Sequence, residues 1–373
     1  MSATLCLIDA VPGGVTAGLA PSLLARRQSQ AQAMTAAGGK LIPLEYRQAW
    51  QLQSLPAADA YKFDAPGQNE ALDHWFLQLG APQGADAGDM RARDAGEIHQ
   101  RRAWFKGFTQ VLCAIAAKGL GPRWLNTVDS ILAMTDKLEC QQRLHRQGLA
   151  VPALLGEFDN FEDLRQRMED TGCERVFVKP RYGSSGSGVI ALRRWRDRWQ
   201  ATSGTVLREG RPGNSLRVLR QSCPRRIGAL VDALAAASPC YAEHWIPKPR
   251  APGGLGACWD LRVVAWRGQA RQRIARVSQH PICNLHLGNQ RATPCWLSSA
   301  QIEQVEHSIS AIASAFPGAQ VFGADLIVKA DRVIVLEVNA FGDHLREVHL
   351  DGRSSHDDQA HELCATADLA TCA

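Results

Sequence analysis

The sequence predicts an α+β fold whose N-terminal part is α/β. Helical stretches separate strand-like segments that come in adjacent pairs, and 373 residues are enough for two or three packed subdomains. The strand-like segments are 175–179, 189–192, 240–246, 260–266, 270–277, 321–328 and 332–338. The helical stretches are 161–170, 225–237 and 299–315.

The N-terminal part begins with strand-like residues 4–11 and continues to a second strand-like piece at 40–46, with a Gln/Ala-rich helical segment between them. The glycines of 13–18 lack the spacing of a dinucleotide fingerprint, so we expect a plain loop there. Residues 80–97 are rich in Gly, Ala and Asp and predict an exposed loop, and 98–119 predict a helix.

Composition excludes several classes of protein. No apolar run reaches about 18 residues, so we expect no membrane span, and the start lacks the features of a secretory signal. The 11 cysteines are scattered singly, which indicates reduced thiols and a cytoplasmic protein. The net charge of +5 favours a solvated basic surface, with attraction to nucleic acid or to an acidic substrate as the alternative.

Residues 125–152 predict two consecutive helices. Asn126 or Asp129 is suited to cap the first helix, and Thr135 or Asp136 to cap the second. Gly148 predicts the end of the second helix, shortly before a proline.

A glycine-rich loop lies between two strands in "VFVKPRYGSSGSGVIAL", with Lys179 before the glycines. In a Walker A loop the lysine follows the glycines and the loop opens a helix, so this is a different arrangement. The backbone N–H groups of Ser184 to Gly188 could fold over phosphates, with the lysine as a point charge beneath them. A hairpin with a flexible tip is the alternative.

The stretch "VFGADLIVKADRVIVLEVNAFGD" predicts a β-hairpin that turns at Ala330–Arg332. If the loop has an odd number of residues, Val328 lies opposite Ile334. Asp325 is then directly across from Glu337.

Asp325, Glu337 and Asn339 would share one face of this hairpin because Glu337 and Asn339 are two residues apart. Acidic groups in such apolar strands are costly unless they are paired or bind a cation. Oxygen-only ligands suit Mg²⁺. The alternative is a buried ion pair between Glu337 and an arginine.

A lysine, a glycine flap and a D…E-x-N hairpin, in that order, resemble the ATP-grasp superfamily. The likeness covers roughly residues 120–345 and is greatest to the branch with glutathione synthetase and the ribosomal-protein glutamate ligases. "NLHLGN" and "EVNAFGD" are shared with a poorly characterised bacterial group of that superfamily. The resemblance implies an N-terminal pre-ATP-grasp domain (1–120), a central lobe with the flap (121–240) and a C-terminal lobe with the metal site (241–373).

The resemblance also implies residue roles. The ATP-binding residues would be Lys137, Lys179, Gly183, Ser184, Ser185, Gly186, Ser187, Gly188, Glu243, His244, Trp245, Ile246 and Asp260, with the four from Glu243 to Ile246 lining adenine mainly through backbone groups. Arg262, Arg276 and Asn284 would be catalytic. Asp325, Glu337 and Asn339 would bind Mg²⁺, with Mn²⁺ as an alternative.

The family's chemistry is ATP-dependent ligation: a carboxylate is phosphorylated to an acyl phosphate, and an amine or related nucleophile then displaces the phosphate. A small-molecule phosphotransferase and a peptide-binding homologue without turnover are the alternatives. We expect a small-molecule or peptide substrate, no nucleic acid and no membrane, and a homodimer is compatible with the sequence. An Arg-rich insertion at 208–226 departs from the family pattern and suggests an acidic or peptide substrate.

Overall fold

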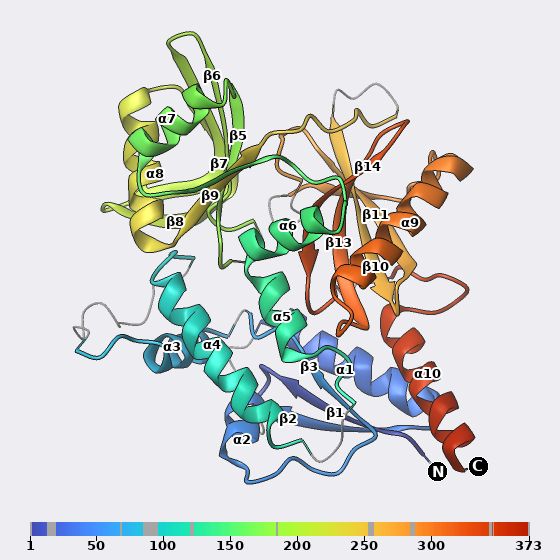
Figure 1. The fold of residues 1–373 in the computed structure, drawn as a ribbon. Coiled ribbons are helices and arrows are strands. Elements are labelled where there is room, and N and C mark those ends of the chain that lie inside the picture. The colour runs from blue at the N-terminus through green and yellow to red at the C-terminus, as the bar shows by residue number, and fades with distance from the viewer. Residues whose placement is uncertain are drawn as a thin grey trace.

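The computed structural model describes residues 2–12, 20–67, 69–84, 96–119, 123–183, 186–252, 257–283, 288–342, 345 and 347–371. These residues form three β-sheets with helices packed against them, as Figure 1 shows. The predicted mixture of an α/β N-terminal part and antiparallel α+β layers is confirmed.

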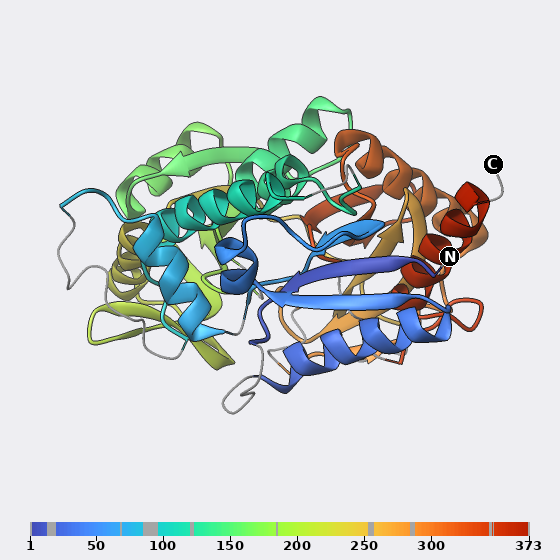
Figure 2. The same cartoon turned by 90° about the horizontal axis from the view of Figure 1, so that it is seen from below.

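The N-terminal sheet is parallel and has the strand order β2-β1-β3. Figure 2 shows helix α1 running along this sheet. The prediction of two strands with a helix between them is confirmed, whereas β3 was not predicted. The elements are β1 (Thr4–Asp9), α1 (Pro21–Ala36), β2 (Lys40–Glu45), α2 (Tyr46–Gln51), β3 (Ala60–Phe63), α3 (Glu70–Leu79) and α4 (Arg101–Ala116).

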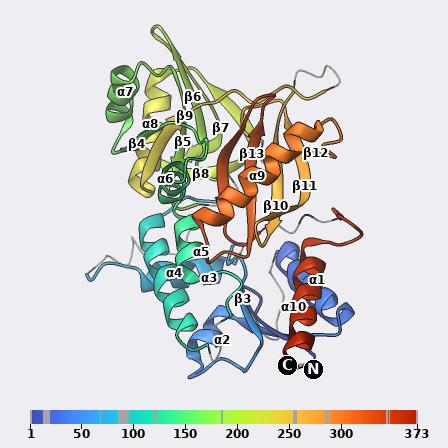
Figure 3. The ribbon, with the colours of Figure 1, turned by 45° about the vertical axis from the view of Figure 1, so that its right-hand side comes forward.

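The last helix, α10 (Ser355–Thr371), returns to this N-terminal layer. It packs against α1, and Figure 3 shows these two helices side by side. Leu5, Met34 and Leu363 belong to the apolar cluster that joins them. The last helix therefore packs against the first strand and the first helix.

The central sheet has six strands in the order β4-β9-β5-β6-β7-β8. The Arg-rich segment 208–226 is not a separate insertion in space: it forms the turn and second strand of the β7–β8 hairpin and the start of α8. The elements are β4 (Leu154–Phe158), α7 (Phe161–Asp170), β5 (Arg175–Pro180), β6 (Ile190–Trp195), β7 (Arg198–Arg208), β8 (Arg211–Gln221), α8 (Pro224–Ala237) and β9 (Cys240–His244).

The C-terminal sheet has five strands in the order β12-β11-β10-β13-β14. Helix α9 covers the face whose Val and Leu side chains belong to the largest apolar core. The elements are β10 (Cys258–Trp266), β11 (Gln269–Ser278), β12 (Gln290–Ala292), α9 (Ser299–Ala315), β13 (Val321–Val328) and β14 (Val333–Asn339).

Helices α5 (Val128–Thr135) and α6 (Lys137–Arg146) connect the N-terminal layer to these two sheets. The predicted cap of α6 is confirmed, because the Asp136 carboxylate accepts the backbone N–H of Glu139 at 3.3 Å. The predicted cap of α5 is wrong: Thr127 caps this helix. The predicted end of α6 is confirmed by Gly148, whose φ is 76°.

Asn126 does not cap α5 because its side chain is fully used elsewhere. Its Nδ2 donates to the carbonyls of Val321, at 2.7 Å, and Ala340. Its Oδ1 accepts the backbone N–H groups of Gln320 and Val321, each at 3.0 Å. The carboxamide therefore ties the start of α5 to both strands of the C-terminal hairpin.

That hairpin pairs Asp325 with Glu337, as predicted, but the turn and the register next to it differ from the prediction. Val328 pairs with Val333 and not with Ile334, so the connection is residues 329–332 and its length is even. A β-bulge at Leu336 then shifts the register by one residue and restores the pairing.

Other predictions fall partly outside the described residues. Positions 13–18 and 85–95 are not described, but Glu97, at the end of the predicted exposed loop, is buried and bridges to Gly213. The ten described cysteines are free thiols, and four of them are buried. None of the helices in the described ranges is long and apolar enough to cross a membrane.

Candidate functional site

One face of the C-terminal sheet carries a cluster of charged residues. The strand pairing places Asp260 across from Arg276 and Arg262 across from Asp325. Asp325 is in turn across from Glu337. Cross-strand partners point to the same side of a sheet, so all these side chains emerge together, opposite the apolar face under α9.

These side chains form a chain of alternating charge. The Asp325 carboxylate accepts from Arg262 Nε, from Arg262 Nη2 at 3.1 Å and from Arg276 Nη2 at 3.0 Å. The Asp260 carboxylate accepts from Arg276 Nε and from Lys248 Nζ, each at 2.7 Å. Burial alone would raise the pKa of Asp325, but the two guanidinium groups outweigh it and lower this pKa to about 2.

The central sheet contributes a second buried pair. Lys179 Nζ on β5 lies 2.5 Å from Glu243 Oε1 on β9, and both side chains are at least nine-tenths buried. Burial raises the pKa of Glu243, and the charge of Lys179 opposes that rise. The same ammonium group also donates to the Leu336 carbonyl of β14 at 3.4 Å, so the two sheets meet at this lysine.

Lys137 makes a second contact with β14. It is the first residue of α6, and its ammonium group forms an ion pair with the Glu337 carboxylate. Arg181, which follows β5, donates to the carboxylate of Asp136, the residue that caps this helix. The structure therefore brings both predicted phosphate-binding lysines to the strand that carries Glu337.

The glycine flap is described in part. Gly186 and Gly188 have φ of 69° and 75°, so both need the freedom of glycine. Ser187 Oγ accepts from Asn214 Nδ2 of β8 at 2.9 Å, a contact that the sequence did not predict. Ser184 and Ser185 lie outside the described residues, while Gly183 precedes this gap.

The predicted hinge, residues 243–246, begins with the last two residues of β9 and continues beyond the strand. The backbone N–H of His244 donates to Ala153 at 2.8 Å, and that of Trp245 donates to Arg175 at 3.0 Å. The Trp245 ring packs against Phe177 with the centroids 5.4 Å apart. These two N–H groups are thus used within the protein. Ile246 is half-buried, and Asn284 lies outside the described residues.

Sequence reasoning missed Lys248 and Gln141. Lys248 is a single lysine between the hinge and β10, and no spacing rule marks it, yet it is buried against Asp260. Gln141 lies one turn after Lys137 and donates to the Leu336 carbonyl at 2.7 Å. A polar residue among the apolar positions of α6 was the only available signal.

The three predicted metal ligands fit Mg²⁺ by their chemistry. Two carboxylates and one carboxamide lie on one face of β13 and β14, and the Asn339 Nδ2 atom is buried without a hydrogen-bond partner among the described residues. The described part of the chain holds no group of three His, Cys, Asp or Glu side chains arranged for a metal. A site with two carboxylates suits Mg²⁺ that is also bound by phosphate oxygens and water.

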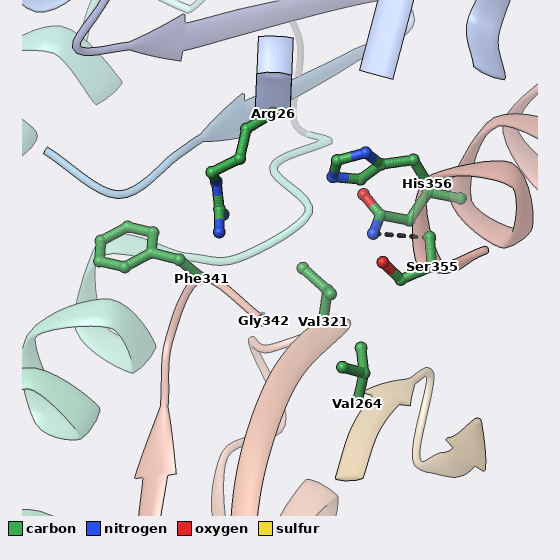
Figure 4. Close-up of a pocket in the computed structure, with 8 residues that line it drawn as sticks. Arg26, Val264, Val321, Phe341, Gly342, Ser355 and His356 are labelled. Atoms are coloured by element: carbon green, nitrogen blue, oxygen red, sulfur yellow. Dashed lines mark hydrogen bonds between the residues drawn. The ribbon is translucent and has the colours of Figure 1, made fainter. Parts of the chain in front are cut away.

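The N-terminal layer reaches this region at the end of β14. Phe341 and Gly342 line a small hollow together with Arg26 of α1 and Ser355 and His356 of α10, as Figure 4 shows. Arg26 Nε donates to Asp64 at 3.0 Å. The hollow begins two residues after Asn339, so α1 and α10 border the end of the candidate metal strand.

Solved structures share this architecture. D-cycloserine synthetase DcsG aligns with a TM-score of 0.57 and 13% identity over 98% of this chain and 99% of that one. Macrocyclase MdnC from Microcystis aeruginosa MRC, bound with the precursor peptide MdnA, aligns with 0.55 and 14% over 96% and 99%. The ATP-grasp ligase PsnB, complexed with a precursor variant, Mg and ADP, aligns with 0.52 and 15% over 96% and 97%.

The chain has the ATP-grasp fold. The predicted superfamily fold is thereby confirmed, and the alignments span nearly the whole chain. The N-terminal sheet and α10 therefore belong to the shared ATP-grasp architecture, although the resemblance in sequence covered only roughly 120–345. No protein-family model and no curated protein matches the sequence.

Proposed function

We propose that this protein is an ATP- and Mg²⁺-dependent ligase that joins a carboxylate to an amine or a related nucleophile through an acyl phosphate. One observation carries the proposal. Lys137, Lys179, Arg262 and Arg276 converge from both lobes on the strands that bear Asp325 and Glu337. Buried and half-buried cations beside paired carboxylates are suited to a metal-bound triphosphate.

In the proposed reaction, the substrate carboxylate attacks the γ-phosphorus of ATP, and ADP leaves. The amine then attacks the acyl carbon and loses a proton, the C–N bond forms, and phosphate leaves with the oxygen that came from the carboxylate. Mg²⁺ held by Asp325, Glu337 and Asn339 would neutralise charge on the transferring phosphate. Arg262 and Arg276 would stabilise the same charge as preorganised donors.

The two lysines have a further role in this proposal. Each is paired with a carboxylate, Lys137 with Glu337 and Lys179 with Glu243. A polyphosphate would compete for both ammonium groups, and Glu337 would then be released to bind a cation. Nucleotide and metal would therefore bind cooperatively.

The glycine flap and the hinge have the same roles in this proposal as those predicted from the sequence. The segment from Gly183 to Gly188 would close over the phosphates and exclude the water that hydrolyses acyl phosphates. Residues Glu243 to Ile246 and Asp260 would border the nucleotide, and Asn284 would contact it. The division at 1–120, 121–240 and 241–373 likewise remains part of the proposal.

For the substrate, we propose an acidic small molecule or peptide that contacts the β7–β8 hairpin. Arg208, Arg217 and Arg220 are exposed on it, and Arg220 pairs with Thr202 on the face of the sheet that also carries Phe177 and Lys179. One structure with the same fold holds a precursor peptide. Replacing Arg217 and Arg220 with Gln should weaken substrate binding and leave ATP affinity unchanged.

A screen for ADP release against pooled carboxylates, amines and peptides tests the ligase proposal. Release that requires both a carboxylate and an amine supports it, whereas a stable phosphorylated product with no amine requirement would indicate a phosphotransferase. Glu337→Ala should abolish Mg²⁺-dependent ATP turnover in a folded protein. Glu303→Ala, an exposed glutamate on α9, is the matched control. Unchanged turnover in Glu337→Ala would remove the metal assignment.

Lys179→Ala tests the nucleotide assignment separately. We expect weaker ATP binding by calorimetry, because the variant loses the ammonium group at the junction of the two sheets. Unaltered ATP affinity in this variant would contradict the role of Lys179.

A further inference from the structure

The orientation of Glu337 depends on an irregularity in its strand. From the turn inward, Val333 pairs with Val328 and Val335 with Leu326, and these side chains belong to the apolar core. A strand that kept strict alternation would send residue 337 to that same side. The carboxylate would then lie in the core and not beside Asp325.

The β-bulge at Leu336 prevents this outcome. Leu326 pairs with Val335 and Asp325 with Glu337, so Leu336 is an extra residue on β14. Beyond the bulge Val338 is the core residue, and Glu337 and Asn339 face the charged cluster. One inserted residue therefore decides whether the two carboxylates meet.

Gln141 holds the bulged residue from α6. Its Nε2 donates to the Leu336 carbonyl at 2.7 Å, closer than Lys179 Nζ at 3.4 Å. Gln141 is only 2% exposed, and its Oε1 has no hydrogen-bond partner among the described residues. Burying an unpaired acceptor costs about 1–3 kcal/mol. A leucine at position 141 would avoid this cost, so stability alone would favour leucine over glutamine there.

Gln141 also shares a helix face with Lys137, four residues earlier. One residue holds the bulge, and the other contacts the carboxylate that the bulge reorients. The neighbouring segment completes the support, because the Val335 N–H donates to the Ala150 carbonyl at 2.9 Å. The outer edge of β14 is thus bound to α6 and the residues that follow it.

We propose that Gln141 is a positioning residue that fixes the Leu336 bulge and so places Glu337 opposite Asp325 for metal binding. This inference rests on the proposed function of Glu337 as a metal ligand. A residue with only a packing role would change stability and leave metal affinity alone. A positioning residue changes metal affinity in a protein that remains folded.

The test is Gln141→Met, which keeps the side-chain length and removes the donor. Mn²⁺ binding in the presence of ADP, followed by electron paramagnetic resonance of the free ion, gives a readout that needs no substrate. We expect the apparent Kd for Mn²⁺ to rise about tenfold in Gln141→Met, equivalent to about 1.4 kcal/mol. Gln142→Met, the same change at the exposed neighbour on α6, should leave this Kd unchanged.

Thermal unfolding of both variants separates folding from positioning. An unchanged Mn²⁺ Kd in folded Gln141→Met would overturn the inference, and an equal rise in Gln142→Met would do the same. If Gln141→Met does not fold, Gln141→Asn decides the question in the same titration, because its shorter side chain withdraws the donor. Glu337→Gln is measured in parallel: an unchanged Kd there refutes the proposed metal site itself.

Discussion

Asp325→Asn removes the carboxylate that lies between the guanidinium groups of Arg262 and Arg276. Lys248, Arg262 and Arg276 are three cations, and Asp260 and Asp325 are the two carboxylates between them, which leaves a net charge of +1 in the cluster. The substitution raises this charge to +2 in a region where Asp325 is only 6% exposed. Removing one partner of a buried ion pair costs about 3–5 kcal/mol.

Arg262→Gln is the informative comparison, since it lowers the net charge of the same cluster from +1 to zero. We therefore expect Asp325→Asn to reduce the free energy of unfolding by about 3–5 kcal/mol and Arg262→Gln to reduce it by clearly less. Asp129→Asn is the surface control, because it breaks a pair with Arg143 whose aspartate is 77% exposed. That change should cost at most about 1 kcal/mol.

The assay is urea unfolding followed by tryptophan fluorescence, with Trp259 next to Asp260 as one of the reporting groups. Differential scanning calorimetry identifies which transition moves. Equal losses in Asp325→Asn and Asp129→Asn would refute the argument that charge balance in this cluster stabilises the fold. So would a larger loss in Arg262→Gln than in Asp325→Asn.

Three further predictions concern pH and local structure. The pKa of Asp325 is lowered from 3.8 to about 2, so the ionised group stabilises the fold above about pH 4, and about 2 kcal/mol is lost as the pH falls toward 2. The difference in unfolding free energy between wild type and Asp325→Asn should therefore shrink by about that amount over this range. Gly188→Ala should destabilise more than Gly148→Ala in urea unfolding: both glycines have positive φ, but an added Cβ meets Pro180 Cγ at 2.4 Å only at Gly188. Asn126→Ala loses four hydrogen bonds, three of them buried, and should lower the unfolding free energy by about 2–4 kcal/mol, against about 1 kcal/mol for the helix cap Asn160→Ala. Similar losses in the two variants would contradict the structural role given to Asn126.

Much of the fold could be predicted from local pattern. Helices 161–170 and 299–315 match α7 and α9 at both ends, because each begins at a polar cap and carries a periodic apolar face. Short elements such as β3 were missed, since four residues carry little periodic signal. The cap of α5 was wrong because the competing asparagine is used in a tertiary contact.

For the candidate site, the sequence by itself determined the chemical inventory and its order: a lysine before a glycine flap, and a hairpin with two carboxylates and an amide. It also predicted the superfamily fold, because these features depend on residue type and spacing. Only the tertiary structure decided the partners. Lys248 donates to Asp260, 12 residues away in the sequence, and Gln141 donates to Leu336, 195 residues away.

The register of β14 shows the reason most clearly. The predicted pairing of Asp325 with Glu337 was right, although the assumed loop length was wrong, because a bulge at Leu336 compensates for the even turn. Whether a strand bulges depends on what supports the extra residue, and here that support is the Gln141 side chain of a distant helix. Side-chain types can be read directly from the sequence, but a register shift of one residue depends on the packing around it.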